Sequence, residues 1–151
     1  MTLWNSTYET GNATVDNDHK EIFALVEQVL QTSFKSRKEK IKTAIDFLAN
    51  YTVRHFGNEE RLMDESAFPH AEMHKKQHAD FLTVVTKLVE KFEGNGYALG
   101  ATEDVSDSTV LHLSLEINKV VVGWLTNHIM SSDRALADHY RLWADKKSVK
   151  R

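Results

Sequence analysis

The stretch IKTAIDFLANYTVRHFGNEERLM covers residues 41–63 and brings an apolar side chain to one face at almost every helical turn. An α-helix completes a turn in about 3.6 residues, so positions three or four apart share a face. The spacing therefore predicts a long amphipathic helix. His55 and Glu59 continue the same inward line as Ile41, Ala44, Ile45, Leu48, Leu62 and Met63. A carboxylate at such a position needs a partner or a metal ion, because burying an unpaired charge is costly.

Three further apolar stripes predict three more helices, beginning near Asp18, His74 and Val110. Breaks are expected around residues 33–36, at Pro69 and along the glycine-containing connection 94–107. We therefore expect an all-α chain that forms an antiparallel up-down-up-down four-helix bundle with an N-terminal arm and a short C-terminal helix. A single domain should span residues 1–151, with the arm at 1–15, the bundle at 16–133 and the C-terminal helix and tail at 134–151.

The composition narrows the classes of function. A net charge of −3 provides no basic field, which argues against nucleic acid as the partner. The chain contains no cysteine, so disulfides and thiolate metal sites are excluded, and a reducing cytoplasm is the expected location. No apolar run approaches the roughly 20 residues that cross a bilayer. The first residues also lack the pattern of a secretory signal, so no membrane association is expected.

Two more segments place possible metal ligands about one helical turn apart. They read HKKQH at residues 74–78 and HIMSSD at residues 128–133. Together with the upstream histidine and the pair in the second helix, the candidate ligands are His19, His55, Glu59, His74, His78, His128 and Asp133. A single histidine on an apolar face is usually a hydrogen-bonded core residue. Five of them with inward carboxylates would leave many buried polar atoms to satisfy, which favours a metal site.

Asp133 does not fit a regular helix. It follows His128 by five residues, which places it roughly 140° around an ideal helix. Both can bind one site only if the helix widens into a π-type turn or ends near Ser131. The remaining histidines are weaker candidates. His70 precedes His74 by four residues at the helix mouth, and the others are His112, off the inward face, and His139, beyond the bundle.

The donor set limits the metal and its chemistry. Imidazole and carboxylate without thiolate suit iron, zinc, copper or manganese. No Glu-x-x-His occurs in the chain, which excludes the usual ferritin-like carboxylate pattern. Two octahedral irons would offer about twelve positions. Five histidines, two bridging carboxylates and one bridging solvent oxygen would leave a single open position, on the iron with two histidines.

These motifs, in this order and at these spacings, resemble the hemerythrin family, especially its bacterial single-domain forms. The likeness covers about residues 4–134 and includes Trp4, Tyr8, the segment 15–20 and the segment 124–129. It implies two non-haem irons with an oxo or hydroxo bridge, one held by His74, His78 and His128 and the other by His19 and His55, with Glu59 and Asp133 bridging both. It also implies dioxygen as the ligand, in a pocket walled by Ile22, Phe56, Trp124, Leu125 and Ile129.

Three functions are compatible with such a centre. The first is reversible dioxygen binding for transport, storage or delivery to an oxygen-using enzyme, by a monomer or weak homo-oligomer rather than by an enzyme. The second is a di-iron enzyme that reduces peroxide or nitric oxide. The third is an oxygen or redox sensor that acts through a separate partner. No nucleophile or acid–base pair beyond the ligands stands out, so the sequence favours the first.

Overall fold

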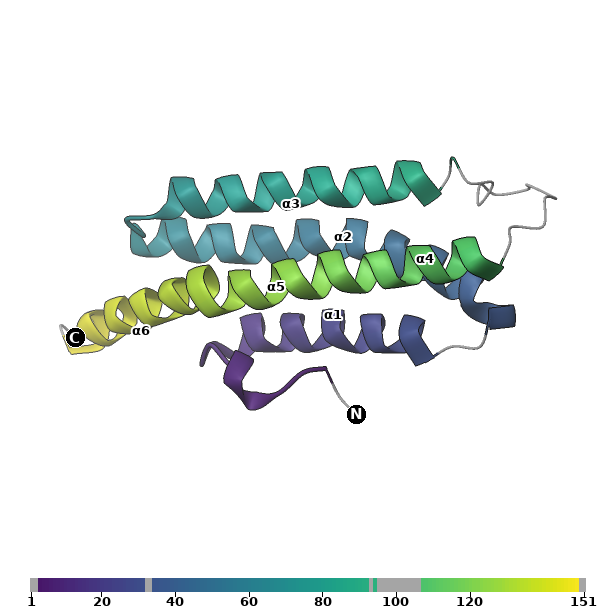
Figure 1. Cartoon of the computed structure of the whole chain (residues 1–151). Helices are drawn as coiled ribbons and strands as arrows, with labels where there is room; N and C mark the ends of the chain where they lie inside the picture. Colours follow the sequence, from purple (N-terminus) through teal and green to yellow (C-terminus); the bar gives the residue numbers. More distant parts are fainter. Residues whose placement is uncertain (1–2, 32–33, 93, 95–106, 150–151) are drawn as a thin grey trace.

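Four long helices lie side by side and alternate in direction (Figure 1). The structure is a computed structural model that describes residues 3–31, 34–92, 94 and 107–149. The first three helices are α1 (Ala13–Gln31), α2 (Phe34–Ser66) and α3 (Ala71–Phe92). The fourth is a composite of α4 (Asp107–Ile117), η3 (Asn118–Val122), α5 (Gly123–His128), η4 (Ile129–Asp133) and α6 (Arg134–Val149). The predicted all-α four-helix bundle is confirmed, whereas most of the 94–107 connection and part of the predicted break at 33–36 lie outside the described residues.

The N-terminal arm is tied to the start of α1. It contains one short helix, η1 (Ser6–Tyr8). The Asn12 side chain accepts hydrogen bonds from the backbone of Thr14 and Val15, which makes it the cap of a helix that begins at Ala13. The last three residues of the predicted arm are therefore helical. Asp16, on the first turn, accepts three more hydrogen bonds from Thr10 and Gly11 and holds the arm against the bundle.

The turn between α2 and α3 is sharp. Ala67 has a positive φ of 50°, which ends α2 after Ser66. The backbone N–H of Phe68 then donates to the carbonyl of Met63 at 2.9 Å. Pro69 follows and cannot continue the hydrogen-bond ladder. This tight connection sets α3 antiparallel to the end of α2, and the two helices stay in contact.

The bundle interior holds one large apolar cluster and a smaller one. The large cluster draws buried residues from all four helices, among them Phe23, Leu48, Phe81 and Ile117. The smaller one lies where α6 leaves the bundle, and its members are Val15, Leu62, Met63, Phe68 and Leu136. No helix in the described part of the chain is long and apolar enough to cross a membrane.

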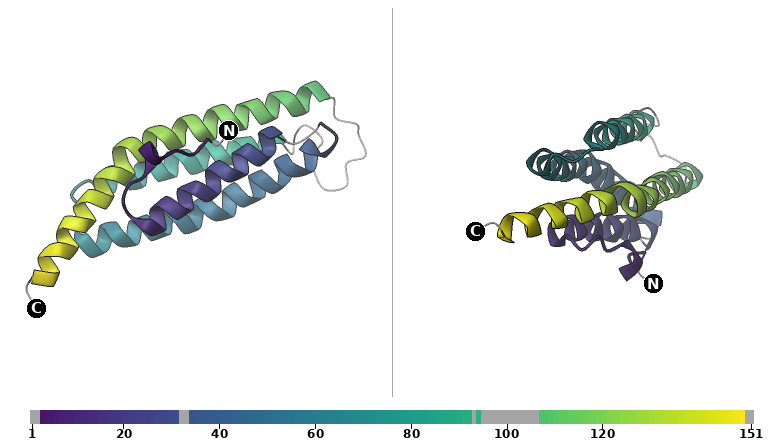
Figure 2. Two further views of the ribbon diagram at one scale, coloured as in Figure 1. Left: turned by 90° about the horizontal axis from the view of Figure 1, so that it is seen from below. Right: turned by 90° about the vertical axis from the view of Figure 1, so that its left-hand side faces the viewer.

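The C-terminal helix differs from the expectation of a separate short piece. α6 continues from η4 without a break and is 16 residues long. Figure 2 shows its far end extending past the bundle. Leu136 anchors its first turns, and further on the Tyr140 hydroxyl donates to Glu65 on α2 at 3.1 Å. α6 is thus an uninterrupted continuation of the fourth helix of the bundle.

Candidate metal centre

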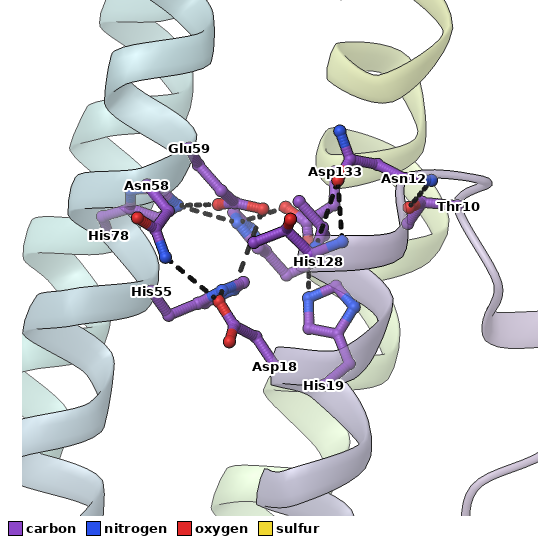
Figure 3. A network of polar contacts seen from close by, with 12 residues as sticks. Thr10, Asn12, Asp18, His19, His55, Asn58, Glu59, His78, His128 and Asp133 are labelled. Carbon is purple, nitrogen blue, oxygen red and sulfur yellow. Dashed lines mark hydrogen bonds and ion pairs between the residues drawn. The ribbon is translucent and has the colours of Figure 1, made fainter.

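Seven buried polar side chains meet between the helices. Figure 3 labels all of them except His74. α1 supplies His19, α2 supplies His55 and Glu59, α3 supplies His74 and His78, and the composite fourth helix supplies His128 and Asp133. Their donor atoms fall into two groups that could each hold a metal ion. One group contains His74, His78 and His128, the other contains His19 and His55, and both include Glu59 and Asp133. Every candidate ligand named from the sequence is in this cluster.

The first group is built on three imidazoles whose Nε2 atoms face one another. His128 Nε2 lies 2.9 Å from His74 Nε2 and 3.2 Å from His78 Nε2. Metal–imidazole distances are about 2.1 Å, so nitrogens on neighbouring corners of an octahedron lie about 3.0 Å apart. Three neutral nitrogens at these separations present lone pairs to a common point. The spacing therefore fits a cation held between them.

The two carboxylates link the groups, each with a different oxygen toward each side. Glu59 Oε2 lies 3.0 Å from His78 Nε2, and Oε1 of the same carboxylate is 3.7 Å from His55 Nε2. Asp133 Oδ1 lies 2.9 Å from His128 Nε2, and its Oδ2 is 3.1 Å from His19 Nε2. Each carboxylate therefore directs one oxygen toward each group of histidines. This is the arrangement that a bridging carboxylate requires.

The widened turn that the spacing of Asp133 demanded is present. Residues Ile129–Asp133 form the π-helical segment η4, which adds one residue to the turn after His128. That extra residue brings Asp133 back to the face that carries His128. The side chain of Asp133 is buried, whereas Ser131 faces outward. The irregular turn thus has a direct consequence for the site.

Many donor atoms in the cluster have short contacts but no hydrogen bond of suitable geometry. Seven buried atoms lack such a hydrogen bond: both oxygens of Glu59, both oxygens of Asp133, both nitrogens of His19 and Nε2 of His55. Native interiors seldom leave such atoms unsatisfied. Coordination of a metal would satisfy the oxygens of Glu59 and Asp133 and the Nε2 atoms of His19 and His55, because a metal ion binds lone pairs. The donor set therefore fits a bound cation.

The two buried carboxylates of the cluster, Glu59 and Asp133, are ionised and require positive charge nearby. Burial and the nearby Asp133 carboxylate raise the pKa of Glu59, but the facing His55, His74 and His78 outweigh them and lower it to about 2. The pKa of Asp133 is likewise held well below its usual range by histidines, against burial. Burial opposes protonation of His74, yet Asp133 and Glu59 raise its pKa to about 9. Without metal, protons on histidine must balance two ionised carboxylates.

Comparison with known proteins identifies the family of the chain. The family model described as "Hemerythrin HHE cation binding domain" matches residues 10–140. The chain belongs to the hemerythrin family. It is 27% identical over 141 residues to a bacteriohemerythrin of Stenotrophomonas maltophilia, covering 93% of this chain and 82% of the relative. A bacteriohemerythrin of Methylococcus capsulatus is 28% identical over 134 residues, at 89% and 92% coverage. A hemerythrin-like protein of Naegleria gruberi is 28% identical over 130 residues, at 86% of each.

Membership of the hemerythrin family implies non-haem iron binding. Among the described residues, both groups of side chains that could hold a metal lie in the cluster between the helices. The structure thus gives the hemerythrin domain of this chain one place where such a metal could be held.

A second layer of polar residues orients the hemerythrin cluster. Asp18 Oδ2 lies 3.2 Å from Nδ1 of His55 and accepts a hydrogen bond from the Asn58 side chain at 3.4 Å. Burial raises the pKa of Asp18, but His55, Asn58 and Arg54 lower it below its ordinary value. An ionised Asp18 holds the Nδ1 proton of His55 and leaves its Nε2 to face the cluster. From the sequence alone Asp18 is only the neighbour of His19, and its contact with His55 was not predicted.

Aromatic rings cover the three-histidine side of the hemerythrin site. Phe56 stacks on His78 with ring centroids 3.8 Å apart, and Trp124 stacks on His128 at 4.3 Å. Phe81 in turn stacks on Trp124 at 4.0 Å. Of the five residues predicted to wall a gas pocket, Ile22, Phe56, Leu125 and Ile129 are buried in the large cluster and Trp124 is partly buried against it. They form continuous apolar packing around the polar site.

The other three histidines stay outside the cluster. His112 is exposed, and its Nδ1 lies 2.8 Å from the carbonyl of Ser108. His139 Nε2 lies 3.0 Å from the carbonyl of Ser66 at the α2–α6 contact. His70 is exposed near the start of α3. None of them belongs to either group of candidate ligands among the described residues.

Proposed function

We propose that this chain binds dioxygen reversibly at a non-haem di-iron centre, for transport, storage or delivery, and that it is not primarily an enzyme. One observation carries the proposal: two groups of ligands, with three and two histidines, share both carboxylates. His74, His78 and His128 would hold one iron, and His19 and His55 the other. Glu59 and Asp133 would bridge both.

The unequal number of histidines supports gas binding rather than a closed structural site. With both carboxylates and a bridging solvent oxygen counted, five histidines leave one of about twelve octahedral positions open. The open position would lie on the side of His19 and His55, which have fewer ligands around them. A bound iron pair would supply the electrons for reversible dioxygen binding, and the seven clustered side chains would hold it in place.

The surrounding residues support a carrier in preference to an enzyme. Phe56 and Trp124 stack directly on ligand histidines, so the interior beside the site is filled by apolar rings. Asp18 is engaged with His55, Asn58 and Arg54 and is not free to exchange protons with a substrate. Dry packing of this kind also slows the escape of charged reduced oxygen species.

The deciding experiment combines metal analysis with an optical titration of the reduced protein by oxygen. We expect about two irons per chain and a visible band that appears with oxygen and disappears on deoxygenation over repeated cycles. Rapid turnover of peroxide or nitric oxide with a reductant, without a reversible oxygen spectrum, would establish the enzyme instead. An oxygen-independent spectrum or a different metal at full occupancy would overturn the proposal.

A further inference from the structure

The N-terminal arm lies on the outside of the bundle and packs on a histidine of the two-histidine group (Figure 1). The Trp4 ring lies beside His19, with ring centroids 6.3 Å apart, and against Phe23 at 5.6 Å. Tyr8 stacks on the same Phe23 at 5.3 Å and contacts Trp4. His19 is 0% exposed, whereas Trp4 and Tyr8 are partly exposed. The arm therefore forms a cover over His19.

Arg134 ties the middle of the arm to the fourth helix. It directly follows Asp133, one of the two shared carboxylates, and its guanidinium donates to the backbone carbonyls of Thr7 and Glu9. The side chains of Thr7 and Glu9 are exposed, so apolar packing at this point comes from the intervening Tyr8. Arg134 therefore supplies a polar hold on the segment that carries the covering rings.

The arm joins α1 through a glycine in an unusual backbone conformation. Gly11 has a positive φ of 86°, which residues with a side chain adopt only with strain. Asp16 accepts hydrogen bonds from Thr10 and Gly11 and fixes the base of the arm to the first turn of α1. Segments with few buried apolar side chains open locally at a lower free energy than the whole domain. A rotation of the arm near Gly11 would uncover His19 and leave α1 intact.

We propose that the arm is a gate over the two-histidine group and that Arg134 is the positioning residue that holds it closed. The inference rests on the proposed function, because the open iron position would lie on this side. The three-histidine group is covered instead by Phe56 and Trp124, which belong to the long helices and cannot move independently of them. Arg134 thereby sets how fast a small ligand enters and leaves, without contacting that ligand.

The cover is tested first with the metal-free full chain. Hydrogen–deuterium exchange read by mass spectrometry follows the arm, and modification by diethyl pyrocarbonate, which reacts with accessible imidazoles, follows His19. Arg134→Gln should raise both rates about tenfold, because it removes charged hydrogen bonds from the closed arm. Arg141→Gln makes the same charge change at an exposed position of α6 and should leave both rates unchanged. Equal rates in the parent and Arg134→Gln proteins would overturn the role of Arg134.

Two comparisons locate the opening. His78 belongs to the other group of ligands, so its modification rate should stay the same in the Arg134→Gln protein. A rise as large as that of His19 would show that the whole bundle has loosened and would contradict a gate on one side. Trp4→Ala removes the covering ring while Arg134 stays in place, and it should also expose His19. Arg134→Lys keeps a charged donor and should recover part of the protection.

Control of access is tested with the iron-loaded protein. Azide, a small anion that binds ferric iron, is the probe in stopped-flow measurements. Arg134→Gln should raise its association and dissociation rate constants by the same factor and leave the dissociation constant unchanged, because a gate alters access alone. Unchanged rate constants, or a rise in only one of them, would overturn the gate. Failure of the chain to hold iron would overturn the proposed function, whereas the metal-free measurements would still decide whether the arm covers His19.

Discussion

Asp133 Oδ1 lies 2.9 Å from His128 Nε2 although five positions separate the two residues on one helix. The π-helical segment η4 makes this contact possible. Deleting Ser131 would shorten the spacing to four, at which a regular α-helix already brings both side chains to one face. We expect this deletion to straighten the helix and to retain metal binding.

The matched control is an alanine inserted after Ser131, which lengthens the spacing to six and turns Asp133 away from His128. Metal content per chain and far-ultraviolet circular dichroism are measured on both proteins. The insertion should lose metal while both keep their helical content. If the deletion loses as much metal as the insertion, the widened turn itself is needed, not merely the position of Asp133.

Glu59 belongs to both groups of ligands, and His55 belongs to only one. Glu59→Ala should therefore abolish stable binding at both positions, whereas His55→Ala should leave residual metal held by the three-histidine group. Inductively coupled plasma analysis after dialysis gives the metal per chain. His112→Ala, at an exposed histidine that belongs to neither group, should leave the metal content intact. A similar loss in all three proteins would contradict the assigned ligands.

Asp18 positions His55 from behind, with 3.2 Å between Oδ2 and Nδ1. Asp18→Ala should weaken metal binding about 10- to 100-fold, the usual effect of removing a hydrogen-bond partner from a metal-bound histidine. Asp18→Asn keeps an acceptor oxygen and should recover part of the affinity. Competition with a chelator measures both. Glu21→Gln, on the exposed side of the same helix, serves as the control and should bind like the parent protein.

Protons and metal compete for His74. In the metal-free protein its pKa is raised from 6.5 to about 9, so its contribution to stability is complete below pH 6.5 and is lost as the pH rises through 9. The melting temperature of the metal-free chain should therefore fall across this window. Apparent metal affinity should rise across it, because binding displaces the proton. A melting temperature that rises with pH in the absence of metal would contradict the raised pKa.

The sequence predicted which side chains gather in the cluster because four of them lie at helical spacing on stripes that were already apolar. His55 with Glu59, and His74 with His78, needed only the 3.6-residue period to be placed on inward faces. Asp133 was predictable only as a condition, because a π turn depends on what packs around the helix. A C-terminal helix from residue 134 was expected, but its continuity with the fourth helix was not, because local spacing does not record whether one helix runs on into the next.

The contacts around the cluster could not be read from the sequence for a different reason. Asp18 and His55 are 37 residues apart, and their contact depends on how α1 packs against α2. The hydrogen bond from the Ser132 hydroxyl to Gln77 likewise joins η4 to α3 across 55 positions of the chain. Such pairs arise from tertiary packing, and no periodicity within one helix encodes them.

Phe56 covers one face of His78, with their rings parallel to within 6° and centroids 3.8 Å apart. Phe56→Ala would remove this ring and open space for water beside the site, at a cost of about 3–5 kcal/mol in stability for a buried phenylalanine. Water stabilises charged leaving groups, so a reduced oxygen species should be lost irreversibly from the oxygen-bound form several-fold faster. Phe56→Leu retains most of the apolar volume, so its decay rate should fall between those of the parent protein and Phe56→Ala. This variant separates the exclusion of water from the loss of stability. The decay of the oxygen spectrum at fixed temperature, read beside a thermal melt, measures both effects. Equal decay rates in all three proteins, with the expected loss of stability in Phe56→Ala, would show that this ring packs the core without protecting the centre.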